Sequence, residues 1–216
     1  MITSFEVKKK ELINKLMKQA LRTEFLHLPS HVNWYPGHMR EAYRTIGPEL
    51  KKVSFFIEVR DSRLPLTSHN LELDVKLKEF KVPKAVVFSK FDLCNEAETM
   101  RHIRDLKKQN PETMMMHLSN RSGQNVNKLI GHIKEQLAAE FRSLGGWVMI
   151  GGVPNVGKSS LINSIRKRDP ELSQAKKAGA RTGGVPCITK SMTGFKVLSD
   201  PLTFCIDTPG IIMPKI

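Results

Sequence analysis

The sequence predicts an α/β fold in which helices cover both faces of a doubly wound, mostly parallel sheet. Short apolar runs typical of buried strands alternate with helical patterns along the chain, and this alternation favours parallel strands joined by helical crossovers. Polar loops follow several strand runs, as expected where a doubly wound sheet binds its ligand. A glycine-rich loop at residues 151–160 separates a strand run from a helical run. We therefore expect a sheet with its functional loops at the carboxyl ends of the strands.

The expected elements follow one another in a regular order. Helices are predicted at residues 40–52, 71–80, 97–108 and 126–141, the first of them interrupted at Gly47-Pro48. Strands are predicted at residues 53–59, 84–88, 114–118, 147–150, 190–198 and 202–206. The polar loop R-D-S-R-L-P-L-T-S-H-N is expected to follow the first strand. Three consecutive methionines, Met114 to Met116, are interpreted as core side chains of a strand.

Composition limits the possible classes of protein. Of the 216 residues, 40% are hydrophobic and 26% are charged, as in a soluble globular protein. The formal net charge of +14 indicates a polyanionic partner, either RNA or an anionic membrane surface, with a merely solvated basic surface as the alternative. Three scattered cysteines argue against disulfides and a zinc site and favour a reducing compartment. No apolar run approaches the roughly 20 residues that a membrane-spanning helix needs.

The first 28 residues form a basic segment with apolar side chains at helical spacing. Three interpretations stay open: an organelle transit peptide, an arm that contacts RNA, and an amphipathic helix that packs on the domain. Three glutamates, Glu6, Glu11 and Glu24, count against a transit peptide, because such peptides are poor in acidic residues.

The loop G-G-V-P-N-V-G-K-S-S matches the phosphate-binding pattern G-x-x-x-x-G-K-[ST] in its strand–loop–helix context. Gly152 and Gly157 would let backbone N–H groups turn toward phosphate oxygens. Lys158 would reach the β- and γ-phosphates, and the Ser159 hydroxyl would ligate Mg²⁺. The alternative is a glycine-rich turn without a ligand. The pattern indicates a nucleotide-binding protein.

A second motif, D-T-P-G, lies at the end of the last predicted strand. Asp207 there can hold Mg²⁺ through water, and the N–H of Gly210 can reach the γ-phosphate as part of a switch. Thr189 is the residue expected to complete the Mg²⁺ shell when the γ-phosphate orders its loop; the alternative is a threonine that opens a strand.

A third motif, S-K-F-D at residues 89–92, resembles the guanine-reading element N/T-K-x-D. Asp92 would accept hydrogen bonds from N1–H and the exocyclic amine of guanine, which adenine cannot offer. The aliphatic stem of Lys90 would lie over the base. In an ordinary G domain this element comes after D-x-x-G, whereas here it precedes the phosphate loop, so the order is permuted.

With these motifs in place, the chain resembles the circularly permuted GTPases of ribosome assembly, in particular the bacterial ribosome biogenesis GTPase A group and its mitochondrial ribosome-associated counterpart. The resemblance covers residues 33–216 and is carried by W-Y-P-G-H-M, E-V-R-D-S-R-L-P-L-T-S-H-N, S-K-F-D-L, G-V-P-N-V-G-K-S-S-L-I-N, P-C-I-T and D-T-P-G-I. It implies a P-loop NTPase with a circularly permuted G domain at 33–216, a basic N-terminal extension at 1–32, and the absence of the C-terminal helical domain with which family members contact ribosomal RNA.

The resemblance also implies individual site residues. Ser119 and Asn120 would supply the remaining guanine contact, and Asn155 would coordinate K⁺ beside the phosphates. Ser89 stands where Asn or Thr is usual, so the hydrogen bond that braces the guanine site should be weaker, while Asp92 preserves the guanine preference. The expected GTP-binding set is Ser89, Lys90, Asp92, Ser119, Asn120, Asn155, Val156, Gly157, Lys158, Ser159, Ser160 and Gly210.

The catalytic residue implied by the resemblance is His38, in the motif W-Y-P-G-H-M. Ras-like enzymes orient the attacking water with a glutamine, but Ile211 occupies that place here and cannot do so. The family assigns this role to the histidine of the motif. From the sequence alone, a structural histidine is the alternative.

The implied activity is GTP hydrolysis by a switch protein that acts on the large ribosomal subunit in assembly and translation, slowly alone and faster with ribosomes and K⁺. The expected cofactors are Mg²⁺ and K⁺, and the expected partners of this monomer are GTP, GDP, the large subunit and its rRNA. The expected location is the mitochondrial matrix, and the cytoplasm is the alternative. Peripheral association with the inner membrane stays open. Two rivals are a nucleotide-gated RNA-binding module with negligible turnover and an ATP-using P-loop enzyme.

Overall fold

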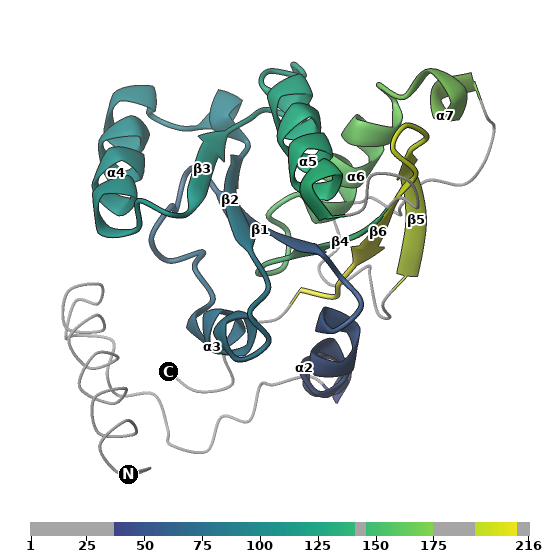
Figure 1. Cartoon of the computed structure of the whole chain (residues 1–216). Coiled ribbons are helices and arrows are strands. Elements are labelled where there is room, and N and C mark those ends of the chain that lie inside the picture. The colour runs from purple at the N-terminus through teal and green to yellow at the C-terminus, as the bar shows by residue number, and fades with distance from the viewer. Residues whose placement is uncertain (1–36, 141–145, 175–192, 211–216) are drawn as a thin grey trace, which may run out of the picture. The chain divides into compact units, whose positions relative to one another are not determined.

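The computed structural model describes residues 37–140, 146–174 and 193–210 (Figure 1). The chain divides into two compact units, Met1–Trp34 and Tyr35–Ile216, and all the described residues belong to the second unit. Among these described residues, no helix is both long and apolar enough to cross a membrane.

Six strands form one sheet in the order β3-β2-β1-β4-β6-β5. The first five positions in this order pair in parallel, and only β5 at the edge runs antiparallel to β6. This arrangement confirms the predicted doubly wound, mostly parallel sheet. The strands are β1 (Phe55–Asp61), β2 (Lys84–Ser89), β3 (Met114–His117), β4 (Gly146–Gly151), β5 (Thr193–Leu198) and β6 (Thr203–Asp207).

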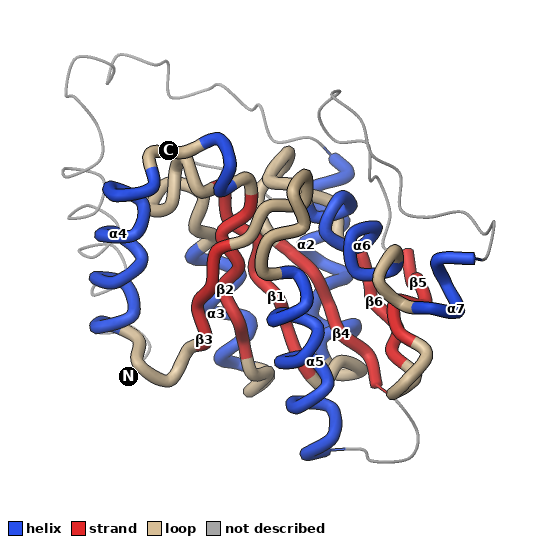
Figure 2. The backbone as a smooth tube through the Cα atoms, turned by 90° about the horizontal axis from the view of Figure 1, so that it is seen from above, coloured by secondary structure: helices blue, strands red, loops and turns tan. Residues whose placement is uncertain are grey.

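Helices cover the two faces of the sheet (Figures 1 and 2). On one face, α5 (Val126–Glu140) and α6 (Lys158–Arg166) pack on the main core. On the other face, α2 (Gly37–Leu50) and α3 (Leu71–Glu79) share a second cluster. On that side α4 (Glu96–Gln109) contributes Ile103 to a third cluster over β2 and β3. The remaining helices are the short α7 (Pro170–Gln174) and the 3₁₀ turn η2 (Phe91–Leu93).

Alternation along the strands explains how the sheet separates its two cores. In β1, Ile57 and Val59 belong to the α5/α6 core, whereas Phe56 belongs to the α2/α3 cluster. Successive strand residues point to opposite faces, and both faces of this strand are buried. In β3, Met115 is buried, and Met114 and Met116 are partly buried against the main core, so the methionine run is a core strand as predicted.

The first strand begins and ends two residues later than predicted, because β1 starts at Phe55 and continues through Arg60 to Asp61. A polar loop was expected to begin at these charged residues. Instead, Arg60 is buried and donates two hydrogen bonds of 2.9 Å to the carboxylate of Glu58, which is fully buried. Lys84 on the neighbouring strand donates to the same carboxylate at 3.2 Å. Burial of charge is tolerated where it is paired and hydrogen-bonded, and this pairing lets the strand continue.

The interruption predicted at Gly47-Pro48 is wrong, because α2 runs through both residues to Leu50. Gly47 lies close to the ring of Phe80, where an added Cβ would be 3.3 Å from a ring carbon. Pro48 lies near the end of the helix, where its missing N–H removes only one intrahelical bond. The glycine therefore serves close packing within the helix and does not end it.

Candidate functional site

The predicted motifs meet at one edge of the sheet. Parallel strands place their carboxyl ends together, and the motifs at residues 89–92, 119–120, 151–160 and 207–210 follow β2, β3, β4 and β6 respectively. Because these strands are neighbours in the order β3-β2-β1-β4-β6, four segments that are far apart in sequence lie side by side.

The loop between β4 and α6 has the backbone of a phosphate-binding loop. Three of its residues have positive φ angles: Gly152 at 144°, Asn155 at 60° and Gly157 at 98°. Gly152 also lies so close to β1 that a Cβ would be 2.3 Å from the carbonyl oxygen of Val59. Such a position requires glycine. Helix α6 begins directly after Gly157, so the N-terminal end of its dipole lies next to this loop.

Lys158 is the first residue of α6 and is 7% exposed. Its ammonium group donates to the carbonyl oxygens of Val153, at 2.9 Å, and Gly152, at 3.3 Å. The ammonium therefore lies inside the phosphate loop, where it can reach an anion bound by the loop.

The D-T-P-G segment lies against the same loop. The Ser159 hydroxyl donates to the Asp207 carboxylate at 2.8 Å, and Asp207 is 1% exposed. Thr208 is tied to β4 by two hydrogen bonds to the carbonyl oxygen of Ile150. A Cβ on Gly210 would be 2.5 to 2.7 Å from atoms of Pro154, so only glycine fits there. Mg²⁺ binds oxygen ligands and keeps several waters, so a hydroxyl and a carboxylate beside a phosphate loop suit this ion.

The S-K-F-D segment is joined to the phosphate loop from the other side. The Ser89 hydroxyl donates to the carbonyl oxygen of Val156. Lys90, which has φ of 57°, donates to the carbonyl oxygen of Asn155 at 2.5 Å. These contacts hold the beginning of the segment against the phosphate loop, and η2 then carries the side chain of Asp92.

Asp92 meets the loop that follows β3. The hydroxyl of Ser119 donates to the Asp92 carboxylate at 2.5 Å, and Ser119 is fully buried. The side-chain amide of Asn120 donates to the carbonyl oxygen of Gly157 at 3.4 Å. The two segments that were predicted to read the base are therefore joined to each other and to the phosphate loop.

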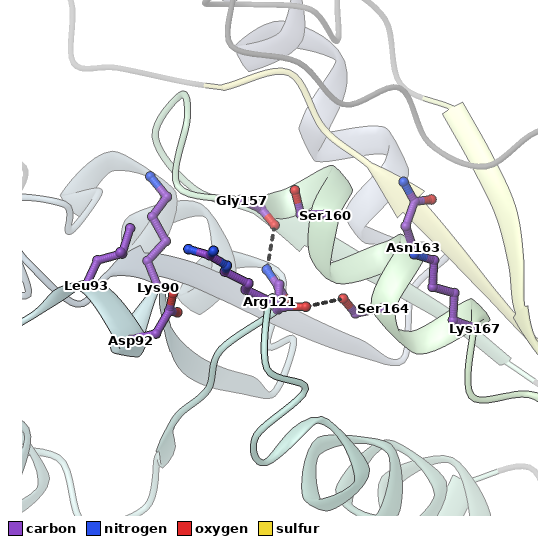
Figure 3. A pocket seen from close by; sticks show the side chains of 10 residues that line it. Lys90, Asp92, Leu93, Arg121, Gly157, Ser160, Asn163, Ser164 and Lys167 are labelled. Atoms are coloured by element: carbon purple, nitrogen blue, oxygen red, sulfur yellow. Dashed lines mark hydrogen bonds between the residues drawn. The ribbon is translucent and has the colours of Figure 1, made fainter.

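A cavity of about 460 Å³ lies between these segments, within the size range of ligand pockets. Figure 3 shows Lys90, Asp92 and Leu93 on one side, with Ser160, Asn163 and Lys167 of the α6 region on the other. Its lining is Lys90, Asp92, Leu93, Asn120, Arg121, Gly157, Ser160, Asn163, Ser164 and Lys167.

Five lining residues were not predicted: Leu93, Arg121, Asn163, Ser164 and Lys167. A signal for three of them is present in the sequence, because Ser160, Asn163, Ser164 and Lys167 have the spacing i, i+3, i+4, i+7 of one helix face.

Asp61 at the end of β1 is a further residue that sequence reasoning missed. Its carboxylate accepts hydrogen bonds from the side chains of Lys90, at 2.9 Å, and Arg63, at 2.7 and 2.9 Å. Burial alone would raise the pKa of Asp61, but hydrogen bonds from Arg63 and Lys90 outweigh burial and lower this pKa to about 2. The Asp61 carboxylate therefore holds Lys90, which is 29 residues further along the chain, beside the phosphate loop.

Two predicted residues cannot be placed in this geometry. Thr189 lies outside the described residues. The backbone of His38 belongs to α2, but its side chain lies outside the described part of the chain. Asn155 is exposed in the phosphate loop, and its role as a K⁺ ligand stays a prediction.

Comparisons with known proteins agree with this geometry. The RsgA GTPase family model matches residues 72–216. The chain is 34% identical to "Short integuments 2, mitochondrial" of Arabidopsis thaliana, over 95% of this chain and 53% of that protein. It is 33% identical to "Mitochondrial ribosome-associated GTPase 1" of Mus musculus, over 85% of this chain and 56% of that protein. It is 32% identical to "Ribosome biogenesis GTPase A" of Bacillus cereus, over 85% of this chain and 60% of that protein.

The chain thus spans between about half and two-thirds of the length of these relatives. Among solved structures, it resembles a GDP-bound structure of TM YlqF with a TM-score of 0.50 and 23% identity, over 79% of this chain and 59% of that chain. This structural likeness supports the fold. The permuted order of the motifs and the sheet agree with this similarity. Because the family model matches well over half of the chain, the chain belongs to the RsgA GTPase family.

Proposed function

We propose that this protein binds and hydrolyses GTP and acts as a switch in the assembly of the large ribosomal subunit and in translation in mitochondria. The observation that carries the proposal is that one cavity runs from Asp92 to the phosphate loop. The Ser119–Asp92 and Asn120–Gly157 hydrogen bonds bring the predicted base-reading segments to this cavity.

Guanine recognition follows from the chemistry of Asp92. Its carboxylate accepts two hydrogen bonds from the N1–H and exocyclic amine of guanine, whereas adenine presents an acceptor at N1. Ser119 orients the carboxylate, and the stem of Lys90 supports the base. Adenine would set the lone pair of its N1 against the carboxylate in place of these donors, so ATP should bind more weakly than GTP.

The phosphate end of the cavity supplies the switch. Lys158 moves from the carbonyl oxygens that it now contacts to the β- and γ-phosphates. Ser159 and Thr189 would hold Mg²⁺ directly and Asp207 would hold it through water, and the ion would supply positive charge beside the phosphates. Gly210, which lies against Pro154, senses the γ-phosphate through its N–H. Loss of the γ-phosphate on hydrolysis then releases the segments that carry Thr189 and Gly210.

Hydrolysis needs a group that orients water and a positive charge near the phosphates. We assign the first role to His38, because Ile211 has no polar atom in its side chain. We assign the second to a K⁺ ion held by Asn155, since such a cation can stabilise the charge that develops in phosphoryl transfer.

The names of the relatives and the net charge of the chain support the proposed ribosome binding and mitochondrial location. Of the three relatives given above, two bear the word mitochondrial in their names, and two, one of them the same protein, are named for ribosome association or biogenesis. A net charge of +14 suits binding to rRNA phosphates, with an affinity that falls steeply as salt rises. We propose a monomer in the mitochondrial matrix.

The test measures GTP turnover by the purified chain alone and with large ribosomal subunits, each in K⁺ and in Na⁺. We expect slow turnover alone and faster turnover with K⁺ and with subunits. Tight GTP binding with a rate that neither addition changes would favour the rival, a nucleotide-gated RNA-binding module. His38→Ala should lower turnover while GTP affinity stays, with His102→Ala on α4 as the control; equal loss of affinity and turnover would indicate a structural histidine.

A further inference from the structure

We propose that Arg168, just beyond the end of α6, is a positioning residue that sets guanine selectivity by holding the loop after β3 against Asp92. This inference rests on the proposed guanine-nucleotide function. Arg168 does not line the cavity, so it would act through the Ser119–Gln124 loop and not by contact with the nucleotide.

The guanidinium of Arg168 bridges two backbone carbonyls. Nη1 donates to the carbonyl oxygen of Ser164 at 2.9 Å, and Nη2 donates to the carbonyl oxygen of Gly123 at 3.0 Å. Gly123 has φ of 79°, and an added Cβ there would lie 2.2 Å from Nη2. The loop therefore has a glycine at the point where the guanidinium comes closest to it.

Hydrogen bonds within the loop connect Gly123, which Arg168 holds, to the base-reading residues. The N–H of Gly123 donates to the carbonyl oxygen of Ser119 at 2.9 Å. The hydroxyl of Ser119 accepts from the N–H of Ser122 at 3.2 Å and donates to Asp92 at 2.5 Å. A loop closed in this way moves as a unit, so the position of Gly123 fixes the direction of the Ser119 hydroxyl.

A second contact from the same helix holds the other side of the loop. The Ser164 hydroxyl donates to the carbonyl oxygen of Asn120 at 3.4 Å. Helix α6 begins at Lys158 in the phosphate loop, and Arg168 follows its last turn. The helix thus sets the spacing between the phosphate loop at its start and the base-reading loop near its end.

The experiment compares Arg168→Ala with Arg166→Ala, using GDP and IDP as probes of the full chain. Arg166 is a matched control, because it also donates to a backbone carbonyl, at 2.5 Å, but this carbonyl belongs to Lys196 in β5. IDP lacks the exocyclic amine that Asp92 reads. We expect Arg168→Ala to lower the preference for GDP over IDP by about tenfold, the effect of one hydrogen bond, and Arg166→Ala to leave this preference unchanged.

Two further measurements keep the test decisive. Arg168→Lys retains one donor for Gly123 and should restore part of the preference. In the nucleotide-free protein, the amide of Gly123 should exchange its hydrogen faster in Arg168→Ala than in Arg166→Ala. An unchanged GDP preference in Arg168→Ala, equal losses in the two alanine variants, or equal exchange would overturn the inference. A wild-type chain with equal affinity for GDP and ADP would contradict the proposed function instead.

Discussion

The hydroxyl of Ser89, at the end of β2, donates a hydrogen bond to the carbonyl oxygen of Val156 in the phosphate loop. Ser89 is fully buried, and its hydroxyl also lies 3.1 Å from the carbonyl oxygen of Arg60 in β1. One small side chain thus connects two strands with the loop that surrounds the phosphates. Serine makes this connection although Asn or Thr is usual at its position in the motif.

Ser89→Ala should weaken nucleotide binding and destabilise the fold. The substitution leaves the buried carbonyl of Val156 without this donor, at a cost of roughly 1 to 3 kcal/mol. We expect about a tenfold or greater loss of GDP affinity, measured by fluorescence titration, together with a lower midpoint of thermal unfolding. Ser89→Thr keeps the hydroxyl and should retain most of the affinity. Equal affinity in the alanine variant and the wild type would contradict a bracing role for Ser89.

Ser159→Ala should remove the Mg²⁺ dependence of nucleotide binding. The hydroxyl of Ser159 and the carboxylate of Asp207 are 2.8 Å apart, so an ion that Ser159 binds directly would lie close enough for Asp207 to hold it through water. Titration of GTP with and without Mg²⁺ should show a strong effect of the ion in the wild type and a small one in the variant. Ser173→Ala on α7, whose hydroxyl donates to the nearby carbonyl oxygen of Pro170, should behave as the wild type. A variant that still gains affinity from Mg²⁺ as the wild type does would exclude Ser159 as a ligand.

Asp61 should contribute stability that depends on pH. Its pKa is lowered from 3.8 to about 2 in the folded protein, so the folded state favours the anion. The contribution is therefore fully present above about pH 5 and disappears as the pH falls toward 2, with a size of up to about 2 kcal/mol. Asp61→Asn should be less stable than the wild type in urea unfolding at pH 7, and this difference should shrink steadily toward pH 3. A difference that is the same at every pH would show that the charge of Asp61 is not its cause.

The motifs that the structure brings together at one edge of the sheet carry all their information within a few residues. The phosphate loop needs two glycines, a lysine and a serine between a strand and a helix, and the sheet follows from alternating apolar and helical runs. What was missed depends on pairs far apart in sequence. Strand β1 includes Arg60 because Arg60 and Lys84 together neutralise the buried carboxylate of Glu58. Lys84 lies 26 residues beyond Glu58. Arg168 and Gly123 are 45 residues apart, and no local pattern relates them.

Boundaries were less predictable than the elements themselves. The helix at 40–52 was divided at Gly47-Pro48 because these residues usually end helices, yet the packing of Phe80 on Gly47 makes them part of α2. Of the cavity lining, the residues on one face of α6 share a helical spacing that was available in the sequence. Arg121 gave no such signal, because an exposed arginine in a polar loop is ordinary.

Guanine recognition by Asp92 is the central claim, and one substitution tests it most directly. In Asp92→Asn, the side-chain amide replaces an acceptor with a donor, which suits the C2 carbonyl of xanthine and not the amine of guanine. Equilibrium binding of GTP, XTP and ATP to the wild type and to this variant is the measurement. We predict that the wild type prefers GTP over both competitors, and that the variant loses GTP affinity and gains XTP affinity, each by at least about a hundredfold. ATP binding to the wild type as tight as GTP binding, or unchanged GTP affinity in the variant, would contradict the claim.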